Sequence, residues 1–241
     1  MIFHLSLYRY SKKMNHVIIV AGGIGSRMNS EIPKQYLLVK GVPVFMYSVC
    51  KFIKREDICS IVLVIADKWK PFVEEHIHNV EKKQEIIFAS AGQSRQHSVL
   101  NGLHALEGVA ADEDLVFVHD SVRPLFPLSN IDDGIEGCRD FDATLPVITV
   151  KDATYQSQNG RTLSSILPRN ELFSGQSPEC FRFRKYLDAH RLFTEEQISS
   201  IRGSAELAYR AGLQVKLISG TEANFKITTT EDLRAFELLI S

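Results

Sequence analysis

The stretch VIIVAGGIGSRM, residues 17–28, predicts a buried strand that ends in a glycine-rich loop. Val17–Ala21 is a continuous, mostly β-branched run, which is typical of a strand covered on both faces in a parallel sheet. Further runs of this kind lie at Ile61–Ile65 and Leu115–His119, and segments with apolar residues at helical spacing lie between them at 44–52 and 98–106. Strands that alternate with helices predict an α/β layered domain whose ligands bind beyond the carboxyl ends of the strands.

The glycine-rich loop offers backbone N–H groups to an anion. Ala21, Gly22, Gly23 and Gly25 form a turn whose N–H groups can face phosphates. The pattern begins like the GxGxxG fingerprint of dinucleotide-binding proteins, but Met28 stands where close helix packing requires a third glycine. It also lacks the GK[ST] ending of an ATPase P-loop. The loop therefore predicts phosphate binding outside these two classes, and the alternative is an ordinary turn beside solvated cations.

Charged residues near this loop and near a second strand end suit a triphosphate. Arg27 lies in the loop, and Pro33 fixes the backbone before Lys34, which directs the ammonium group over the loop. Attack on an α-phosphorus needs positive charge at the developing negative oxygens. Asp120, at a strand end, can ligate Mg²⁺, and Arg123 is placed to meet an acceptor phosphate. The alternative for this last pair is a local salt bridge, worth about 1 kcal/mol if exposed.

Length, composition and charge exclude several classes of protein. The 241 residues, 44% of them hydrophobic, suit one domain at residues 17–241, preceded by an N-terminal extension at 1–16. The formal net charge of −1 gives no general attraction to nucleic acid or to an anionic membrane, so we expect neither as a partner. Scattered cysteines, and the lack of a secretory signal or a membrane span, predict a cytoplasmic protein. Translation starts at Met1 or at Met14, directly before the first strand.

Residues 150–181 differ from the rest of the chain because they are polar and rich in turns. Asn159-Gly160 predicts a type I′ hairpin between extended pieces at Ala153–Gln156 and Thr162–Ile166, which would form a projecting β-arm. A two-stranded arm is marginally stable alone, so we expect it to pack on a second subunit in a homodimer. Beyond the arm we expect a helical region to about Arg210, a strand at Gln214–Ile218 and a terminal helix capped at Thr230.

Six motifs occur in a fixed order along the chain. They are AGGIGSRM (21–28), PKQ (33–35), GQSRQHSVLNGL (92–103), VHDSVRP (118–124), PRNELFSGQSP (168–178) and NFKITTTEDL (224–233). From about Val17 to the C-terminus the chain resembles the cytidylyltransferases that make CDP-methylerythritol or CDP-ribitol. The resemblance implies a doubly wound, mostly parallel sheet of the Rossmann-like nucleotidyltransferase fold, and dimerisation through a β-arm at about 150–181.

The resemblance also implies roles for individual residues on the CTP side. Arg27 and Lys34 would bind the triphosphate and stabilise the transition state. The CTP-binding set is completed by Ala21, Gly22, Gly23 and Gly25 in the loop, and by Gly92, Arg95 and Ser98 around the cytosine. His97 and His119 have no paired base or metal partner in the sequence, so we assign neither a catalytic role.

Other positions match the acceptor side of the family's site. Asp120 would take the metal and the acceptor hydroxyl, while Arg123 and Lys226 would neutralise phosphates near the reacting centre. Arg169 matches an arginine that the arm donates to the acceptor phosphate of the partner subunit, a task that suits a bidentate guanidinium.

Two segments on the acceptor side depart from the family pattern. Lys151-Asp152-Ala153-Thr154 stands where the family usually has Asp-Thr, so the acceptor-binding hydroxyl is either lost or moved to Thr154. A usual Thr-Asp pair is replaced near Arg202–Ala205. The acceptor half is therefore where this chain differs most from the family it resembles.

These features together predict a CTP-dependent cytidylyltransferase that joins CMP to an alditol phosphate with Mg²⁺ or another divalent cation and releases pyrophosphate. DSVRP, FSGQSP, Trp69 and TEEQ are more similar to the ribitol-phosphate branch, whereas RQHSV and NGL favour the methylerythritol branch. We favour D-ribitol 5-phosphate as acceptor, with 2-C-methyl-D-erythritol 4-phosphate as the alternative.

Two rivals belong to other classes. An NAD-dependent oxidoreductase would need the missing third glycine and an acidic residue after the second strand. A non-catalytic nucleotide-binding protein would keep the loop but lose Lys34, Asp120 or Lys226, and all three are present.

Overall fold

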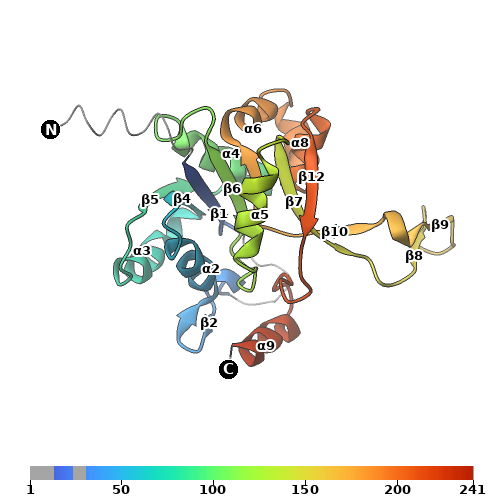
Figure 1. Ribbon diagram of the computed structural model, residues 1–241. Coiled ribbons are helices and arrows are strands. Elements are labelled where there is room, and N and C mark those ends of the chain that lie inside the picture. Colours follow the sequence, from blue (N-terminus) through green and yellow to red (C-terminus); the bar gives the residue numbers. More distant parts are fainter. Residues whose placement is uncertain (1–13, 24–30, 241) are drawn as a thin grey trace.

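The chain folds around one mixed, mostly parallel sheet that carries helices on both faces (Figure 1). The computed structural model describes residues 14–23 and 31–240, and the predicted site residues Gly25 and Arg27 lie outside these ranges. The strands are β1 (Asn15–Val20), β2 (Leu38–Val39), β3 (Val42–Pro43), β4 (Ile58–Ile65), β5 (Glu85–Ser90), β6 (Leu115–Asp120), β7 (Ala143–Thr149), β8 (Thr154–Gln156), β9 (Ser165–Leu167), β10 (Phe173–Gly175), β11 (Glu179–Arg182) and β12 (Val215–Ser219). The helices are α2 (Val44–Ile53), α3 (Lys70–His78), α4 (Arg95–Leu106), α5 (Ser129–Gly137), α6 (Phe183–His190), α7 (Glu195–Ser200), α8 (Ser204–Arg210) and α9 (Thr230–Leu239), with 3₁₀ turns η2 (Lys34–Tyr36), η3 (Asp67–Trp69) and η4 (Arg169–Glu171).

Strand β1 is buried on both faces, as its apolar run predicts. Val17 and Ile19 pack into a core with residues of α2 and α3, while Ile18 belongs to a second core with residues of α4 and α6. Successive side chains of a strand point to opposite faces, so one uninterrupted apolar run serves both layers. The predicted α/β layers and doubly wound sheet are confirmed.

The order of the strands places a crevice beyond β1. The sheet runs β10-β7-β11-β6-β1-β4-β5, and β12 pairs with β7. β1 pairs in parallel with β4 on one side and with β6 on the other, so the carboxyl ends of all three strands lie together. Such a point, where connections leave in opposite directions, is where doubly wound sheets bind ligands.

An antiparallel strand brings a distant segment to the same place. β11 pairs with β6 so that Glu179 lies opposite Val118, two residues before Asp120. The backbone N–H of Asp120 donates to the Oγ of Ser177 at 3.0 Å. The segment before β11 therefore forms one wall of the crevice.

The arm projects from the sheet, but its turn differs from the prediction (Figure 1). β8 and β9 pair antiparallel, with Thr154 opposite Leu167. A type I′ turn requires positive φ at both central residues, whereas only Gly160 has it, at +70°. The Oδ1 of Asn159 instead accepts hydrogen bonds from the N–H groups of residues 161 and 162, which makes an Asx turn within a longer loop. The predicted antiparallel hairpin is confirmed, whereas its assignment to a type I′ turn is wrong.

The terminal helix α9 begins one residue earlier than predicted. Its N-cap is Thr229, whose Oγ1 accepts from the N–H of Asp232 in a capping box, so the assignment of Thr230 as the cap is wrong. Phe236 on this helix packs with Val122 and Ile227 beside the crevice. None of the helices in the described part of the chain is long and apolar enough to cross a membrane.

Candidate active site

The crevice holds a cavity of about 460 Å³, which we call the loop-side cavity. It lies at the carboxyl ends of β1 and β6 and at the start of α4, and Lys226 reaches it from the segment before α9. Its lining residues are Val20, Ala21, Gly22, Gly23, Lys34, Gln35, Gly92, Gln93, Ser94, Arg95, Ser98, Asp120, Ser121, Val122 and Lys226. The structure therefore brings together most of the residues that the sequence places on the CTP side.

The first residues of the glycine-rich loop are held by the PKQ motif. Gln35 donates from Nε2 to the carbonyl oxygens of Ala21 and Gly23 at 2.6 and 2.7 Å, and the Tyr36 hydroxyl donates to Ala21 at 2.9 Å. These bonds occupy carbonyl groups of the turn. The N–H of Ala21 donates to the carbonyl of Val64 at 2.8 Å, so within the described residues the N–H groups of Gly22 and Gly23 are the ones left for a ligand. From the sequence, this motif was used only to place Lys34, and the role of Gln35 in holding the loop was missed.

Gly22 allows two loops to cross closely. A Cβ at this position would lie 2.3 Å from the Cβ of Ala91, which follows β5. Gly23 has open space around its Cα, with nothing within 4 Å of an added Cβ. The glycine at 22 is therefore required by packing, whereas the one at 23 leaves room beside the cavity.

The turn before α4 forms the opposite wall. The N–H of Gly92 donates to the Oγ of Ser98 at 3.0 Å, and that hydroxyl donates to the carbonyl of Ser94 at 3.0 Å. Ser94 caps the helix by accepting from the N–H of His97 at 3.3 Å. The predicted cytosine-binding residues Gly92 and Ser98 thus belong to one ordered turn. Nε2 of His97 lies 2.5 Å from Oε2 of Glu195 of α7, and His97 is not part of the cavity lining.

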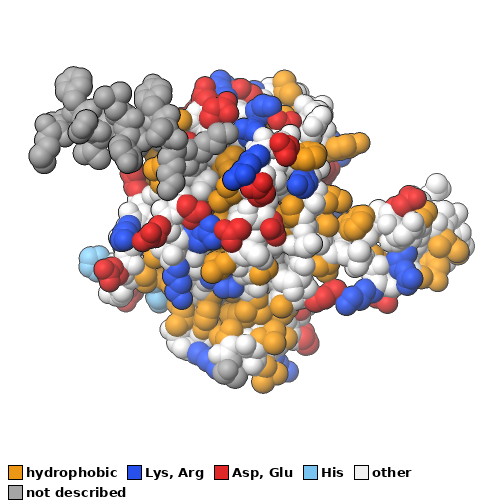
Figure 2. Space-filling model, in the orientation of Figure 1, with side chains coloured by type: hydrophobic (Ala, Val, Ile, Leu, Met, Phe, Trp, Pro, Cys, Tyr) orange, Lys and Arg blue, Asp and Glu red, His pale blue; other side chains and the backbone are white. Residues whose placement is uncertain are grey.

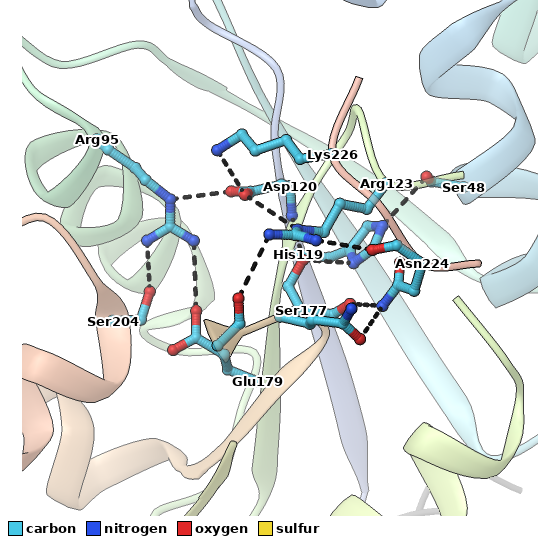
Figure 3. A network of polar contacts seen from close by, with 12 residues as sticks. Ser48, Arg95, His119, Asp120, Arg123, Ser177, Glu179, Ser204, Asn224 and Lys226 are labelled. Atoms are coloured by element: carbon cyan, nitrogen blue, oxygen red, sulfur yellow. Dashed lines mark hydrogen bonds and ion pairs between the residues drawn. The ribbon is translucent and has the colours of Figure 1, made fainter. Parts of the chain in front are cut away.

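Asp120 is the centre of the charged groups in the crevice (Figure 3). Its Oδ1 accepts from Nε of Arg95 at 2.9 Å and its Oδ2 from Nζ of Lys226 at 2.8 Å, and Nε of Arg123 lies 3.8 Å from Oδ2. Burial raises the pKa of the Asp120 carboxyl, but the charges of Arg95 and Lys226 outweigh it and hold the pKa well below its usual range. Asp120 is therefore a carboxylate at neutral pH.

Glu179 is a buried partner of Arg95 that sequence reasoning missed. NH2 of Arg95 lies 3.4 Å from Oε1 of Glu179, and NH1 donates to the Oγ of Ser204 at 2.7 Å (Figure 3). Oε2 of Glu179 accepts from the N–H of Ala205 at 2.7 Å, and burial raises the pKa of this carboxyl. Arg95 is thus fixed on three sides. Glu179 and Ser204 lie 84 and 109 positions from Arg95 in the chain, so local patterns did not reveal them.

Arg123 and His119 make contacts that connect the crevice to the surrounding segments. Arg123 donates from NH1 to the carbonyl of Asn224 at 2.7 Å and from NH2 to that of Gly175 at 3.4 Å, so its terminal nitrogens are engaged within the chain. His119 contacts the hydroxyls of Ser48 and Ser177, both at 3.1 Å. Burial lowers the pKa of His119 to about 3, which keeps its ring neutral.

A second cavity, of about 280 Å³, adjoins the first, and we call it the α8-side cavity. Both cavities are lined by Arg95, Asp120 and Lys226. The other residues around the second cavity are Arg123, Leu145, Gly175, Gln176, Ser177, Glu179, Arg202, Gly203, Ala205 and Glu206. Two ligands that occupied the two cavities would meet at Asp120 and Lys226.

The structure does not bring the two predicted arm residues into this crevice within one chain. NH1 of Arg169 donates to the carbonyl of Lys151 at 2.9 Å, and Oγ1 of Thr154 lies 3.4 Å from the carbonyl of Asp152. Neither residue lines either cavity. A contribution from them would have to come from another copy of the chain.

The charged groups fit one divalent cation held jointly with a ligand. Within the described residues, no three His, Cys, Asp or Glu side chains are grouped to hold a metal. Mg²⁺ is commonly bound by one or two carboxylates together with phosphate oxygens and water, so a single ionised Asp120 at the cavity wall meets its needs. Asp120 is the residue that would hold the ion, which would supply positive charge to the phosphates.

A doubly wound sheet with a glycine turn, cations and one carboxylate at its crevice defines a nucleotide-binding α/β enzyme. The family model for 2-C-methyl-D-erythritol 4-phosphate cytidylyltransferase matches residues 15–241. The chain therefore belongs to this family and is a cytidylyltransferase.

Relatives in the family carry two different names. The chain is 32% identical to the 2-C-methyl-D-erythritol 4-phosphate cytidylyltransferase of Clostridium novyi, over 94% of this chain and 96% of that protein. It is 31% identical to the ribitol-5-phosphate cytidylyltransferase of Streptococcus pneumoniae, over 92% of this chain and 97% of that protein. The acceptor is therefore not settled by similarity.

Solved structures support the same fold. The 4-diphosphocytidyl-2C-methyl-D-erythritol synthase of Anaerococcus prevotii matches with a TM-score of 0.80 at 23% identity, covering 95% of this chain and 96% of that chain. The Francisella tularensis 2-C-methyl-D-erythritol 4-phosphate cytidylyltransferase matches with a TM-score of 0.79 at 25% identity, covering 94% and 99%. Membership in this family argues against the oxidoreductase alternative.

Proposed function

We propose that the chain transfers the cytidylyl group of CTP to D-ribitol 5-phosphate, giving CDP-ribitol and pyrophosphate. The observation that carries this proposal is the pair of adjoining cavities that share Arg95, Asp120 and Lys226. A nucleotidyl transfer needs two phosphate-bearing substrates whose reacting atoms meet at one charged centre, and this arrangement supplies one.

The loop-side cavity is proposed as the CTP site. The turn offers the N–H groups of Gly22 and Gly23 to the triphosphate, and Lys34, which lines the same cavity, adds a positive charge. Gly92 and Ser98 belong to the turn proposed to surround the cytosine. Gly25 and Arg27 complete the proposed triphosphate contacts, although they lie outside the described residues.

The α8-side cavity is proposed as the acceptor site. An oxygen of the acceptor phosphate attacks the α-phosphorus of CTP in line with the departing pyrophosphate, so one P–O bond forms as another breaks. Lys226 and Lys34 neutralise the charge that develops on the phosphate oxygens. The attacking oxygen is already ionised at neutral pH, so the protein needs no nucleophilic side chain and acts by positioning and charge.

A divalent cation at Asp120 belongs to this proposal. When bound, it would supply positive charge beside the phosphates of CTP. Lys226 and Arg95 already hold the carboxylate in the crevice from two sides. The protein's own part is therefore to keep Asp120 ionised and oriented.

The choice of ribitol 5-phosphate rests on sequence likeness and on one relative. DSVRP, FSGQSP, Trp69 and TEEQ are closer to the ribitol-phosphate branch, and the Streptococcus pneumoniae relative is a ribitol-5-phosphate cytidylyltransferase. The alternative acceptor is 2-C-methyl-D-erythritol 4-phosphate, which the name of the Clostridium novyi relative supports. RQHSV and NGL in α4 favour this alternative.

The arm is proposed to form a homodimer. Tyr155, Leu163 and Ile166 are each at least 60% exposed, and apolar side chains are visible along the projecting arm in Figure 2. Apolar groups on a marginal two-stranded element favour burial against another surface. In such a dimer Arg169 and Thr154 would serve the acceptor site of the partner.

The experiment that tests the function is pyrophosphate release with CTP and Mg²⁺ in the presence of different acceptors. Ribitol 5-phosphate, 2-C-methyl-D-erythritol 4-phosphate and a panel of other alditol phosphates are compared by kcat/KM. We expect ribitol 5-phosphate to give the highest value. A higher kcat/KM for 2-C-methyl-D-erythritol 4-phosphate would make that compound the acceptor instead. No pyrophosphate release with any acceptor would refute the transferase proposal.

A further inference from the structure

Arg202 is a cation at the α8-side cavity that the proposed function leaves without a task. Its guanidinium has no hydrogen bond or ion pair with any residue in the described ranges, although Arg202 is one of the residues that line the cavity. The other cations of the lining are engaged inside the protein: Arg95 with Asp120 and Glu179, Lys226 with Asp120, and Arg123 with two backbone carbonyls. Arg202 therefore differs from its neighbours in keeping its donors for a ligand.

The backbone that carries Arg202 is anchored, although its side chain is exposed. The N–H of Arg202 donates to Oε2 of Glu206 at 3.0 Å, and Glu206 is held in turn by Arg210 at 2.7 Å. Two residues further on, Ser204 accepts from Arg95 at 2.7 Å, and the N–H of Ala205 is bound by Glu179. This wall is therefore ordered by contacts at Arg202 and at the residues that follow it.

The same contacts tie Arg202 to the reacting centre. Ser204 binds the guanidinium of Arg95, which binds Asp120, so the wall and the centre form one hydrogen-bonded chain of groups (Figure 3). Two residues of extended backbone span at most about 7 Å, and an arginine side chain reaches about as far. Arg202 is thus within reach of a group that lies in the cavity between it and Lys226.

We propose that Arg202 is an acceptor-binding residue whose guanidinium binds the phosphate of the acceptor from within the same chain. Guanidinium groups bind phosphate by two parallel hydrogen bonds, which fixes its orientation as well as its position. The acceptor class that follows is a phosphate monoester whose dianionic group lies between Arg202 and Lys226. The inference rests on the proposed function, because it takes the α8-side cavity as the acceptor site.

The first test compares kinetic constants of Arg202→Ala, Arg202→Lys and Arg184→Ala with those of the wild type. Arg184 is a half-buried arginine of α6 that pairs with Asp188 and lines neither cavity, so it serves as a control. We expect Arg202→Ala to raise the KM for ribitol 5-phosphate roughly 10- to 100-fold, the usual range for losing hydrogen bonds to a charged group. We expect the KM for CTP to be unchanged, the lysine variant to be intermediate and Arg184→Ala to equal the wild type.

A second readout identifies the group that Arg202 binds. Inorganic phosphate and unphosphorylated ribitol are used as inhibitors competing with the acceptor. We expect Arg202→Ala to weaken inhibition by phosphate and to leave inhibition by ribitol unchanged. If the variant weakens inhibition by ribitol but not inhibition by phosphate, the assignment to phosphate is overturned. The guanidinium would then lie at the hydroxyl end of the acceptor.

The outcomes separate this inference from the proposed function. Turnover of ribitol 5-phosphate with the same acceptor KM in wild type and Arg202→Ala overturns the inference and leaves the function intact. If the wild type turns over no acceptor, binding of ribitol 5-phosphate and of inorganic phosphate is measured by calorimetry in the presence of CTP. Weaker binding in Arg202→Ala then supports the inference, whereas equal binding, or no binding by the wild type, overturns it.

Discussion

Asp120 shows how single charged groups in this crevice depend on one another. The side chain of Asp120 is only 13% exposed, and each of its oxygens accepts a hydrogen bond from a cation. A buried carboxylate without such partners would be strongly disfavoured. Glu179 plays the same part for Arg95 from the other side. The alternating positive and negative groups hold one another in place before any substrate binds.

Lys34 is expected to act only through its charge in the transition state. We predict that Lys34→Ala lowers kcat about 10²–10³-fold or below detection, because removing one such stabilising group typically costs about 3–4 kcal/mol. Urea unfolding should be unchanged. Lys83→Ala, which alters a lysine that is 85% exposed and distant from the crevice lining, serves as the control. A wild-type rate in Lys34→Ala would refute the role.

His190 makes the stability of the fold depend on pH. The ring is 1% exposed, its Nδ1 contacts the carbonyl of Tyr186 at 2.9 Å, and burial lowers its pKa to about 4. Below pH 6.5 the unfolded chain takes up a proton that the folded chain does not, so stability is lost as the pH falls from about 6.5 to about 4. The shift corresponds to at most about 3 kcal/mol.

The corresponding variant is His190→Gln, which stays uncharged over this range. We predict that its free energy of unfolding, measured in urea at several pH values, falls less steeply than that of the wild type between pH 6.5 and 4. Parallel curves for the two proteins would contradict the buried neutral histidine.

At the scale of elements, the cap of α9 supports one wall of the crevice. Thr229 and Asp232 bond to each other's backbone N–H groups, and Phe236 holds the helix against Val122. We predict that Thr229→Ala lowers the free energy of unfolding by about 1 kcal/mol, the usual cost of losing an N-cap. Thr230→Ala is a matched control because Thr230 lies inside the helix, and it should change stability by a few tenths of a kcal/mol. Equal losses would indicate that the cap is not at Thr229.

Elements that depend on local pattern were predicted well from the sequence. β1, β4, β6, α2 and α4 each carry a continuous apolar run or helical spacing, and these patterns follow directly from burial of one or both faces. The turn at Asn159 was predicted wrongly because its side chain competes with the backbone for hydrogen bonds. The preference of the Asn-Gly dipeptide for type I′ turns does not take that competition into account.

Contacts between distant elements explain most of what sequence reasoning missed in the site. Glu179 reaches Arg95 only because β11 inserts between β6 and β7. Gln35 binds Ala21 only because η2 folds back onto the loop. Lys34, Asp120 and Lys226 were predicted to lie together through the family resemblance, and they line one cavity. Without that resemblance, the place of Lys226 in the sequence does not indicate that it lies beside Lys34 and Asp120.

At the scale of the whole molecule, the arm separates residues that the proposed chemistry needs together. Arg169 and Thr154 lie on a segment that projects from the sheet, outside the lining of both cavities (Figure 1). Exposed Tyr155 and Ile166 on the same segment favour burial against a second copy. We predict that Ile166→Asp shifts the protein from dimer to monomer in analytical ultracentrifugation, since a buried charge without a partner is strongly unfavourable. A monomeric wild type would contradict the homodimer.

The final prediction tests whether Arg169 acts in the partner's site. Arg169→Ala alone should raise the KM for the acceptor and leave CTP binding nearly unchanged. In a dimer that joins one Arg169→Ala chain to one Lys34→Ala chain, one of the two sites would have both residues intact if Arg169 acts across the interface. After unfolding and refolding an equal mixture, random pairing gives such an intact site in about a quarter of all sites. We therefore expect activity at low acceptor concentration to rise to about a quarter of the wild-type rate. If Arg169 serves its own chain, no site in the mixture has both residues, and activity stays at the mean of the two variants.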